Sequence, residues 1–257
     1  MAIIRKSATE LEKMRQSGLL VYEILQKLKS MVREGVTTMD LEIATEKMIR
    51  DAGAKPAFKG YYSEAAGTKF PYVLCTSINE AVVHGMPSTK RQLRNGDIVS
   101  LDTGVCLNGY YGDSAVTVGV GKLPEKTERL LAVTQEALEQ AIFQAIPGNR
   151  LFDISRAVEE HVNRNGFSIV REFVGHGIGT SLHEEPQVPN YVDRKQENPK
   201  LKEGMVLAIE PMVNEGQPET NVLSDKWTAV ATDGRPSAHF EHMVAITANG
   251  PWVLTRP

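Results

Sequence analysis

The sequence predicts one α+β domain built from two related halves. Two pairs of helix patterns alternate with two groups of apolar strand patterns along the 257 residues, an order typical of sheets covered by helices. The same elements recur in the same order, which indicates an internal repeat of roughly 8–123 and 124–250. No stretch between the halves has the composition of a flexible linker, so we expect residues 1–257 to form a single domain.

Composition and charge narrow the class of protein. Hydrophobic residues make up 41% of the chain, enough to bury a sizeable core, and 29 basic against 32 acidic residues leave a net charge of −3. No basic run could track phosphates, so we expect no nucleic-acid partner. Only two cysteines occur, Cys75 and Cys106, which indicates a reducing compartment. We find no signal-peptide core and no 18-residue apolar run, and we therefore expect a cytoplasmic protein with no membrane partner.

The first helix pair is predicted near the N-terminus. Thr9 and Glu12 fit a capping box, and apolar residues then recur at helical spacing as far as Leu28. A second helix is predicted over about 39–52 and ends at Gly53.

The second pair repeats the first. Pro124 can open a long helix that stops at Pro147, and another is predicted over roughly 153–165, ending at Gly166. Residues 35–53 align with 148–166 at one offset without a gap, and five positions are identical: Gly35/Gly148, Asp40/Asp153, Ala44/Ala157, Glu46/Glu159 and Gly53/Gly166.

The stretch from Ile98 to Val120 is predicted to form a β-hairpin around Asn108-Gly109, the preferred pair for a type I′ turn. With that turn, Asp102 faces Ala115, and Asp113 is its diagonal neighbour about 7–8 Å away on the same side of the sheet. Two carboxylates in otherwise apolar strands are costly unless a positive charge neutralises them.

The second half repeats this arrangement, because Glu210 ends the run MVLAIEP and Glu241 lies in HFEHMVAIT. No basic residue lies in these stretches, and His176, flanked by glycines in GHGIG, is the nearby donor that could complete a metal site. These glycines also suggest a backbone that approaches a neighbour closely. A phosphate-binding loop is disfavoured because Thr180 replaces the third glycine of G-x-G-x-x-G. For each acid taken alone, a solvent-facing position without a metal is the ordinary alternative. We expect His161 to lie on a helix surface and His242 to pack or hydrogen-bond within the protein.

The motifs SLDTG, YYGDSAV, GHGIGTSLHEEP, GMVLAIEP and FEH, in this order, closely resemble those of the bacterial-type type I methionine aminopeptidases, which have the pita-bread fold. The resemblance covers nearly the whole chain. It implies two pseudo-twofold-related α+β halves with a central antiparallel sheet covered by helices. It also implies two divalent metal ions (Co, Mn, Fe or Zn), with two bridging ligands, Asp113 and Glu241, in a set of five: Asp102, Asp113, His176, Glu210 and Glu241.

The implied activity is removal of the initiator methionine from nascent chains with a small second residue, by attack of a metal-bridged hydroxide on the first peptide bond. Glu210 would be the general base, His183 would hydrogen-bond the peptide oxygen, and His84 would stabilise the tetrahedral intermediate or the scissile nitrogen. The implied partners are nascent N-termini and, transiently, the ribosome surface, for a monomeric enzyme.

The resemblance also implies a methionine pocket and a monovalent cation site. The expected pocket residues are Cys75, Trp227, Phe70, Leu182 and Tyr62. Backbone carbonyls would hold Na⁺ or K⁺ at three positions: Asn79, Ala81 and Ser237. The chain departs from the family pattern at Leu182, where phenylalanine is common, at His239, where glutamine is more usual, and over the longer stretch 58–70.

Two other functions fit parts of the sequence. A prolidase-like or aminopeptidase P-like exopeptidase would share the five ligands, but those enzymes add a large N-terminal domain for which the early first helix leaves no room. A catalytically silent peptide-binding scaffold is disfavoured because all five ligands are present.

Overall fold

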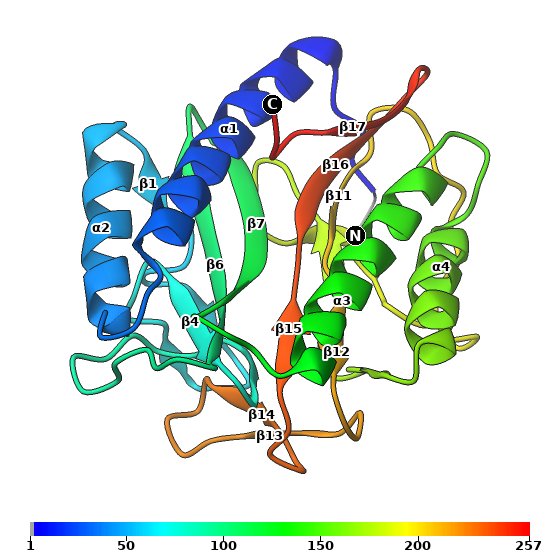
Figure 1. The fold of residues 1–257 in the computed structure, drawn as a ribbon. Helices are drawn as coiled ribbons and strands as arrows, with labels where there is room; N and C mark the ends of the chain where they lie inside the picture. Colours follow the sequence, from blue (N-terminus) through cyan, green and yellow to red (C-terminus); the bar gives the residue numbers. More distant parts are fainter. Residues whose placement is uncertain (1–2) are drawn as a thin grey trace.

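The computed structural model describes residues 3–257. Its four helices form two pairs on the outside of the molecule, one on each side of the strands (Figure 1). The helices are α1 (Ala8–Met31), α2 (Thr38–Asp51), α3 (Glu125–Gln144) and α4 (Leu151–Arg164). The α+β class predicted from the sequence is therefore confirmed.

The predicted start of the first helix is wrong by two positions. Ser7, and not Thr9, caps α1: its hydroxyl accepts from the Glu10 N–H, and the Glu10 carboxylate accepts from the Ser7 N–H at 2.8 Å. Ser7-x-x-Glu10 and Thr9-x-x-Glu12 both fit a capping box. The earlier one is used: Ser7 has extended backbone, and the N–H of the preceding residue, Lys6, donates to the Gly204 carbonyl at 2.6 Å outside the helix.

The other three helices lie close to their predicted positions. Thr37 and Asp40 form the capping box of α2, and Gly53 follows it with a φ of +67°, in the left-handed region that suits glycine. Pro124 is the N-cap of α3, and α4 begins two residues before the predicted 153.

The predicted hairpin is confirmed residue by residue. It consists of β6 (Ile98–Leu107) and β7 (Tyr110–Gly119), and Asp102 pairs with Ala115 while Asp113 pairs with Gly104. Strands β1 (Lys55–Pro56) and β4 (Cys75–Ile78) flank β6 on its other edge.

The second half contains a five-stranded antiparallel sheet. Its strands, in spatial order, are β10 (Glu184–Val188), β9 (Gly175–Gly177), β11 (Val206–Ile209), β16 (His242–Thr247) and β17 (Gly250–Val253). Smaller sheets complete the fold: β15 (Ser237–His239) with β12 (Met212–Asn214) and β8 (Ser168–Ile169); β13 (Thr220–Val222) with β14 (Ala229–Ala231) and β5 (Ala81–Val83); and the hairpin β2 (Tyr62–Ser63) with β3 (Thr68–Lys69).

The two halves meet along β7. The Glu241 N–H donates to the Ala115 carbonyl at 2.9 Å, and the Thr117 hydroxyl donates to the His239 carbonyl at 2.8 Å. One hydrophobic cluster lies under α1 and α2 and another under α3 and α4, and Val116 packs against both. This seam brings acidic residues of both halves to one place. No helix within residues 3–257 is long and apolar enough to cross a membrane.

Candidate active site

A cavity of about 280 Å³ lies at the seam between the two halves. Its lining includes every predicted metal ligand, both predicted catalytic histidines and four of the five predicted pocket residues: Asp102, Asp113, His176, Glu210 and Glu241; His84 and His183; and Cys75, Phe70, Leu182 and Trp227. Residues far apart in the sequence thus converge on one small space.

The hairpin supplies the first two carboxylates. Asp102 and Asp113 are buried on adjacent strands in the predicted register. Gly104 makes room for them, because a Cβ at this position would lie only 3.2 Å from Asp113 Oδ1. Burial raises the pKa of Asp102 to about 7, and burial together with the neighbouring Asp102 charge raises the pKa of Asp113 well above its usual value.

The second half supplies the other three groups. Glu210 follows β11, Glu241 lies directly before β16, and His176 is at the centre of β9. The Nδ1–H of His176 is placed to donate to the Gly177 carbonyl at 2.9 Å, which leaves its Nε2 lone pair free, 3.6 Å from Glu210 Oε1. Burial raises the pKa of Glu210 to about 8 and lowers that of His176 to about 3.

These groups fit a metal centre. Three buried carboxylate oxygens have no hydrogen-bond partner within the described chain: Asp102 Oδ1, Asp113 Oδ1 and Glu241 Oε1. Ligand atoms of Asp113, His176 and Glu241 all lie within 4.8 Å of one another. The described lining of the cavity contains no lysine or arginine. Buried carboxylates without partners are strongly unfavourable, and a divalent cation is the group that would satisfy them.

His84 is held at the cavity by an unusual backbone. It follows β5 with a φ of +60°, a conformation rare for a residue with a side chain. The next residue, Gly85, packs closely against the neighbouring backbone: a Cβ at this position would lie 2.8 Å from Ser77 Cα. The ring of His84 meets Phe173 edge-on at 5.5 Å, and burial lowers its pKa to about 4.

His183 lies against His176, the predicted ligand histidine. The ring centroids of His183 and His176 are 4.3 Å apart, and His183 Nδ1 lies 2.9 Å from the Tyr61 hydroxyl. Burial lowers the pKa of His183. Both non-ligand histidines are therefore neutral at pH 7, and each carries one N–H.

An apolar recess adjoins the carboxylates. Cys75, Phe70 and Trp227 form one buried cluster, with Phe70 and Trp227 edge-on at 5.1 Å, and Leu182 lines the same cavity. Burial raises the pKa of the Cys75 thiol well above its usual value, so the thiol is neutral.

The structure does not place Tyr62 in the predicted methionine pocket. Tyr62 is 56% exposed and does not line the cavity. Its neighbour Tyr61 lines the cavity instead. At the neck of the β2–β3 hairpin, the Phe70 N–H donates to the Tyr61 carbonyl at 2.9 Å, and the register of the hairpin places these two residues opposite each other. Paired residues face the same side of a sheet, so the predicted position of Phe70, combined with this register, would have identified Tyr61.

A buried carboxylate supports the recess from behind. Glu42 on α2 accepts the N–H groups of Val73 at 3.0 Å and Leu74 at 2.9 Å, directly before Cys75. Burial raises the pKa of Glu42 to about 6 against the lowering effect of these hydrogen bonds.

His239 lies on the cavity side of β15, as predicted from its position two residues before Glu241, and its Nε2 is 3.4 Å from Glu210 Oε2.

The other two histidines do not line the cavity. His242 hydrogen-bonds the Thr255 hydroxyl, and His161 lies on α4 beside Glu136. The cavity also contains apolar residues that the sequence patterns did not single out: Phe58, Val83, Phe173, Val174 and Met212.

The backbone of Asn79 and that of Ser237 lie together, since the Ser237 N–H donates to the Asn79 carbonyl at 2.8 Å. Asn79 has a φ of +53°, and Ala81 begins β5 two residues later.

Comparisons with known proteins agree with this geometry. The model of metallopeptidase family M24 matches residues 12–248. A methionine aminopeptidase of Clostridium perfringens is 49% identical over 253 residues, 98% of each chain. The crystal structure of a Thermotoga maritima methionine aminopeptidase superposes with a TM-score of 0.94, at 43% identity and over 100% of both chains. A Pyrococcus furiosus prolidase shares the fold, with a TM-score of 0.77 at 24% identity over 99% of this chain and 66% of its own.

Proposed function

This chain belongs to metallopeptidase family M24 and, within it, to the bacterial-type methionine aminopeptidases, and from this premise we propose how its cavity works. It is a hydrolase that removes an N-terminal methionine, and it has the pita-bread fold of the family. The prolidase-like alternative is supported only at the level of the fold. The silent-scaffold alternative is disfavoured by the intact cluster of acids around His176.

The observation that carries the proposal is the convergence of four carboxylates, three of them buried and that of Glu210 nearly so, and one buried histidine on a single cavity. We assign two divalent ions to this set, which Asp102, Asp113, His176, Glu210 and Glu241 would hold. Within the set, His176 Nε2 and Glu210 Oε1 lie 3.6 Å apart. Oxygen-rich ligands with one imidazole favour Mn, Fe or Co over a thiolate-type zinc site, although Zn also accepts them. When bound, such ions supply a nucleophilic water and polarise the peptide carbonyl.

The side chains around the ions then move protons and orient the peptide. Glu210 accepts a proton from the attacking water and returns it to the leaving amine. His183 donates its Nε2–H to the carbonyl oxygen of the first peptide bond, and the Tyr61 hydroxyl, by donating to Nδ1, keeps the proton on Nε2. His84 donates its N–H to the tetrahedral intermediate or the scissile nitrogen.

The apolar recess explains the choice of methionine. Cys75, Phe70, Trp227 and Leu182 surround a space with no charged group of its own, suited to an unbranched thioether side chain. One methylene is worth only about 1–3 kcal/mol in such a pocket, so discrimination against leucine is partial. The preference for a small second residue is supported by the position of His183 and Tyr61, whose rings are in contact and line the cavity together.

We also assign the cellular setting and the domain organisation. The protein acts as a cytoplasmic monomer on nascent chains, in transient contact with the ribosome, and the free thiols of Cys75 and Cys106 support a reducing compartment. The backbone carbonyls of Asn79, Ala81 and Ser237 bind Na⁺ or K⁺, which the approach of two of these segments supports. The order of two helices and a hairpin, followed by two helices and a sheet, supports a single domain with an internal repeat.

The test is peptide cleavage by chelator-treated protein with Co, Mn, Fe or Zn added back separately. Release of methionine from Met-Ala-Ser, but little from Met-Leu-Ser or Leu-Ala-Ser, is expected, with two metal ions bound per active chain. Cleavage that reaches its maximum with one ion would overturn the two-ion assignment. Equal cleavage of all three peptides would overturn the assigned pocket.

A further inference from the structure

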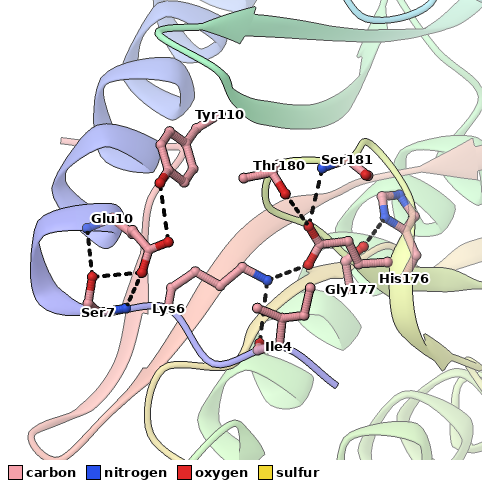
Figure 2. Close-up of polar contacts among 10 residues, drawn as sticks. Ile4, Lys6, Ser7, Glu10, Tyr110, His176, Gly177, Thr180 and Ser181 are labelled. Carbon is pink, nitrogen blue, oxygen red and sulfur yellow. Dashed lines mark hydrogen bonds and ion pairs between the residues drawn. The ribbon is translucent and has the colours of Figure 1, made fainter. Parts of the chain in front are cut away.

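A buried ion pair lies beside the active-site cavity without lining it. Lys6 Nζ and Glu184 Oε2 are 2.5 Å apart, and their side chains are only 3% and 7% exposed (Figure 2). Every other ion pair that lysine or arginine makes within residues 3–257 has at least one side chain 35% or more exposed. Burial of an ion pair is costly and often adds no net stability, so this pair calls for a role other than stability.

Lys6 is anchored to the second half of the chain. Its backbone N–H donates to the Gly204 carbonyl at 2.6 Å, and Arg5 Nε donates to the Glu203 carbonyl at 2.6 Å. Lys6 Nζ also donates to the Ile4 carbonyl at 3.4 Å. The turn at 203–204 leads directly into β11, whose end carries Glu210. The lysine therefore extends from a fixed point on the framework of the metal site.

Glu184 holds both ends of a short segment. Its Oε2 contacts Lys6, while its Oε1 accepts the Ser181 N–H at 3.2 Å and the Thr180 hydroxyl at 3.5 Å (Figure 2). The two residues between these contacts, Leu182 and His183, both line the cavity. One carboxylate thus closes a loop whose tip consists of a pocket residue and a substrate-contacting histidine.

Gly179 shows how closely the lysine passes beneath this loop. A Cβ at this position would lie 2.6 Å from Glu184 Oε1 and 2.7 Å from Lys6 Nζ. A side chain at the third glycine of GHGIG would therefore displace one or both partners of the ion pair. Gly177 leaves room for the backbone of the adjacent strand β10, since a Cβ there would lie 3.0 Å from the Glu184 carbonyl oxygen.

We propose that Lys6 and Glu184 are positioning residues that lock the segment 180–184 to the metal-site framework, so that His183 meets the substrate carbonyl in the reactive geometry. The inference rests on the proposed role of His183. A displacement of a reacting group by about 1 Å can cost about 100-fold in rate, so loss of the pair should act mainly on kcat.

The test compares Lys6→Met, Glu184→Gln and the double variant Lys6→Met/Glu184→Gln with wild type, all in the metal-loaded form. Glutamine keeps the acceptor for the Ser181 N–H but removes the charge. Lys6→Met should lower kcat for Met-Ala-Ser by about 10- to 100-fold with little change in KM, and lower Tm because Glu184 is left buried and unpaired. The double variant should recover Tm but not kcat.

Hydrogen exchange gives a readout that does not depend on turnover. Peptides covering 176–186 should exchange faster in Lys6→Met, while those from α3 and β6 stay as in wild type. Lys47→Met is the matched control, because the Lys47–Asp51 pair on α2 is 66% and 52% exposed, and it should leave both readouts unchanged.

Recovery of kcat together with Tm in the double variant, or wild-type exchange in 176–186, would overturn the proposal. If Lys6→Met does not fold, Glu184→Gln alone answers the question: a fall in kcat at unchanged KM supports the pair, and wild-type kcat overturns it. His183→Ala is measured alongside, because full activity in that variant would refute the proposed role of His183 and not the link between the pair and the loop.

Discussion

Replacement of Glu42 by glutamine should change how the free energy of unfolding depends on pH. Glu42 is buried behind the methionine recess, where it accepts the N–H groups of Val73 and Leu74. Burial raises its pKa from 4.5 to about 6. The folded state therefore binds this proton more tightly than the unfolded state, and the resulting stability is fully present below pH 4.5 and lost as the pH rises through about 6. The difference between the two pKa values corresponds to about 2 kcal/mol.

Urea unfolding of wild type and Glu42→Gln between pH 4 and 7.5, with the same metal content, measures this contribution. The difference between the two proteins cancels the titration of all distant groups. Wild type should lose about 2 kcal/mol relative to Glu42→Gln as the pH rises across this range. A difference that is constant within error, or that grows in the opposite direction, would mean that the two amides compensate fully for the burial of the carboxylate, and would refute the reasoning.

Four further variants test the assigned site. His84→Ala and His183→Ala should each lower kcat/KM for Met-Ala-Ser by about 100-fold or more. Elemental analysis should find the same amount of bound metal per chain as in wild type. A loss of metal would show that the replaced histidine is a metal ligand. Asp113→Asn should lose bound metal, yet raise the Tm of the metal-free protein because one of several mutually repelling buried carboxylates is neutralised; a lower Tm would contradict this. Trp227→Ala should narrow the preference for Met-Ala-Ser over Phe-Ala-Ser in a competition assay, whereas an unchanged ratio would exclude Trp227 from the pocket.

The parts of the site that could be predicted have local causes. Asn108-Gly109 determines the turn, the turn determines the register, and the register places Asp102 and Asp113 on one side of the hairpin. The metal-type interpretation follows from chemistry alone, because carboxylates in apolar strands need a cation. The function followed from motif resemblance, and the relatives with the same activity confirm it.

The errors came from choices that local patterns leave open. Two overlapping capping boxes were available for α1, and the anchoring of Lys6 on Gly204 selected the earlier one. Either tyrosine of the longer stretch 58–70 could have faced the cavity, and the pairing of Tyr61 with Phe70 selected the first.

The sequence by itself determined the helices, the hairpin and the kinds of ligand, because each depends on residues that lie close together in the sequence. Only the tertiary structure decided which side chains meet across the seam. The Lys6–Glu184 pair joins residues 178 positions apart, and the cluster of Asp113, His176 and Glu241 joins three segments that are distant in the sequence. Such contacts are set by the packing of both halves at once, and no periodicity or spacing within one segment contains that information.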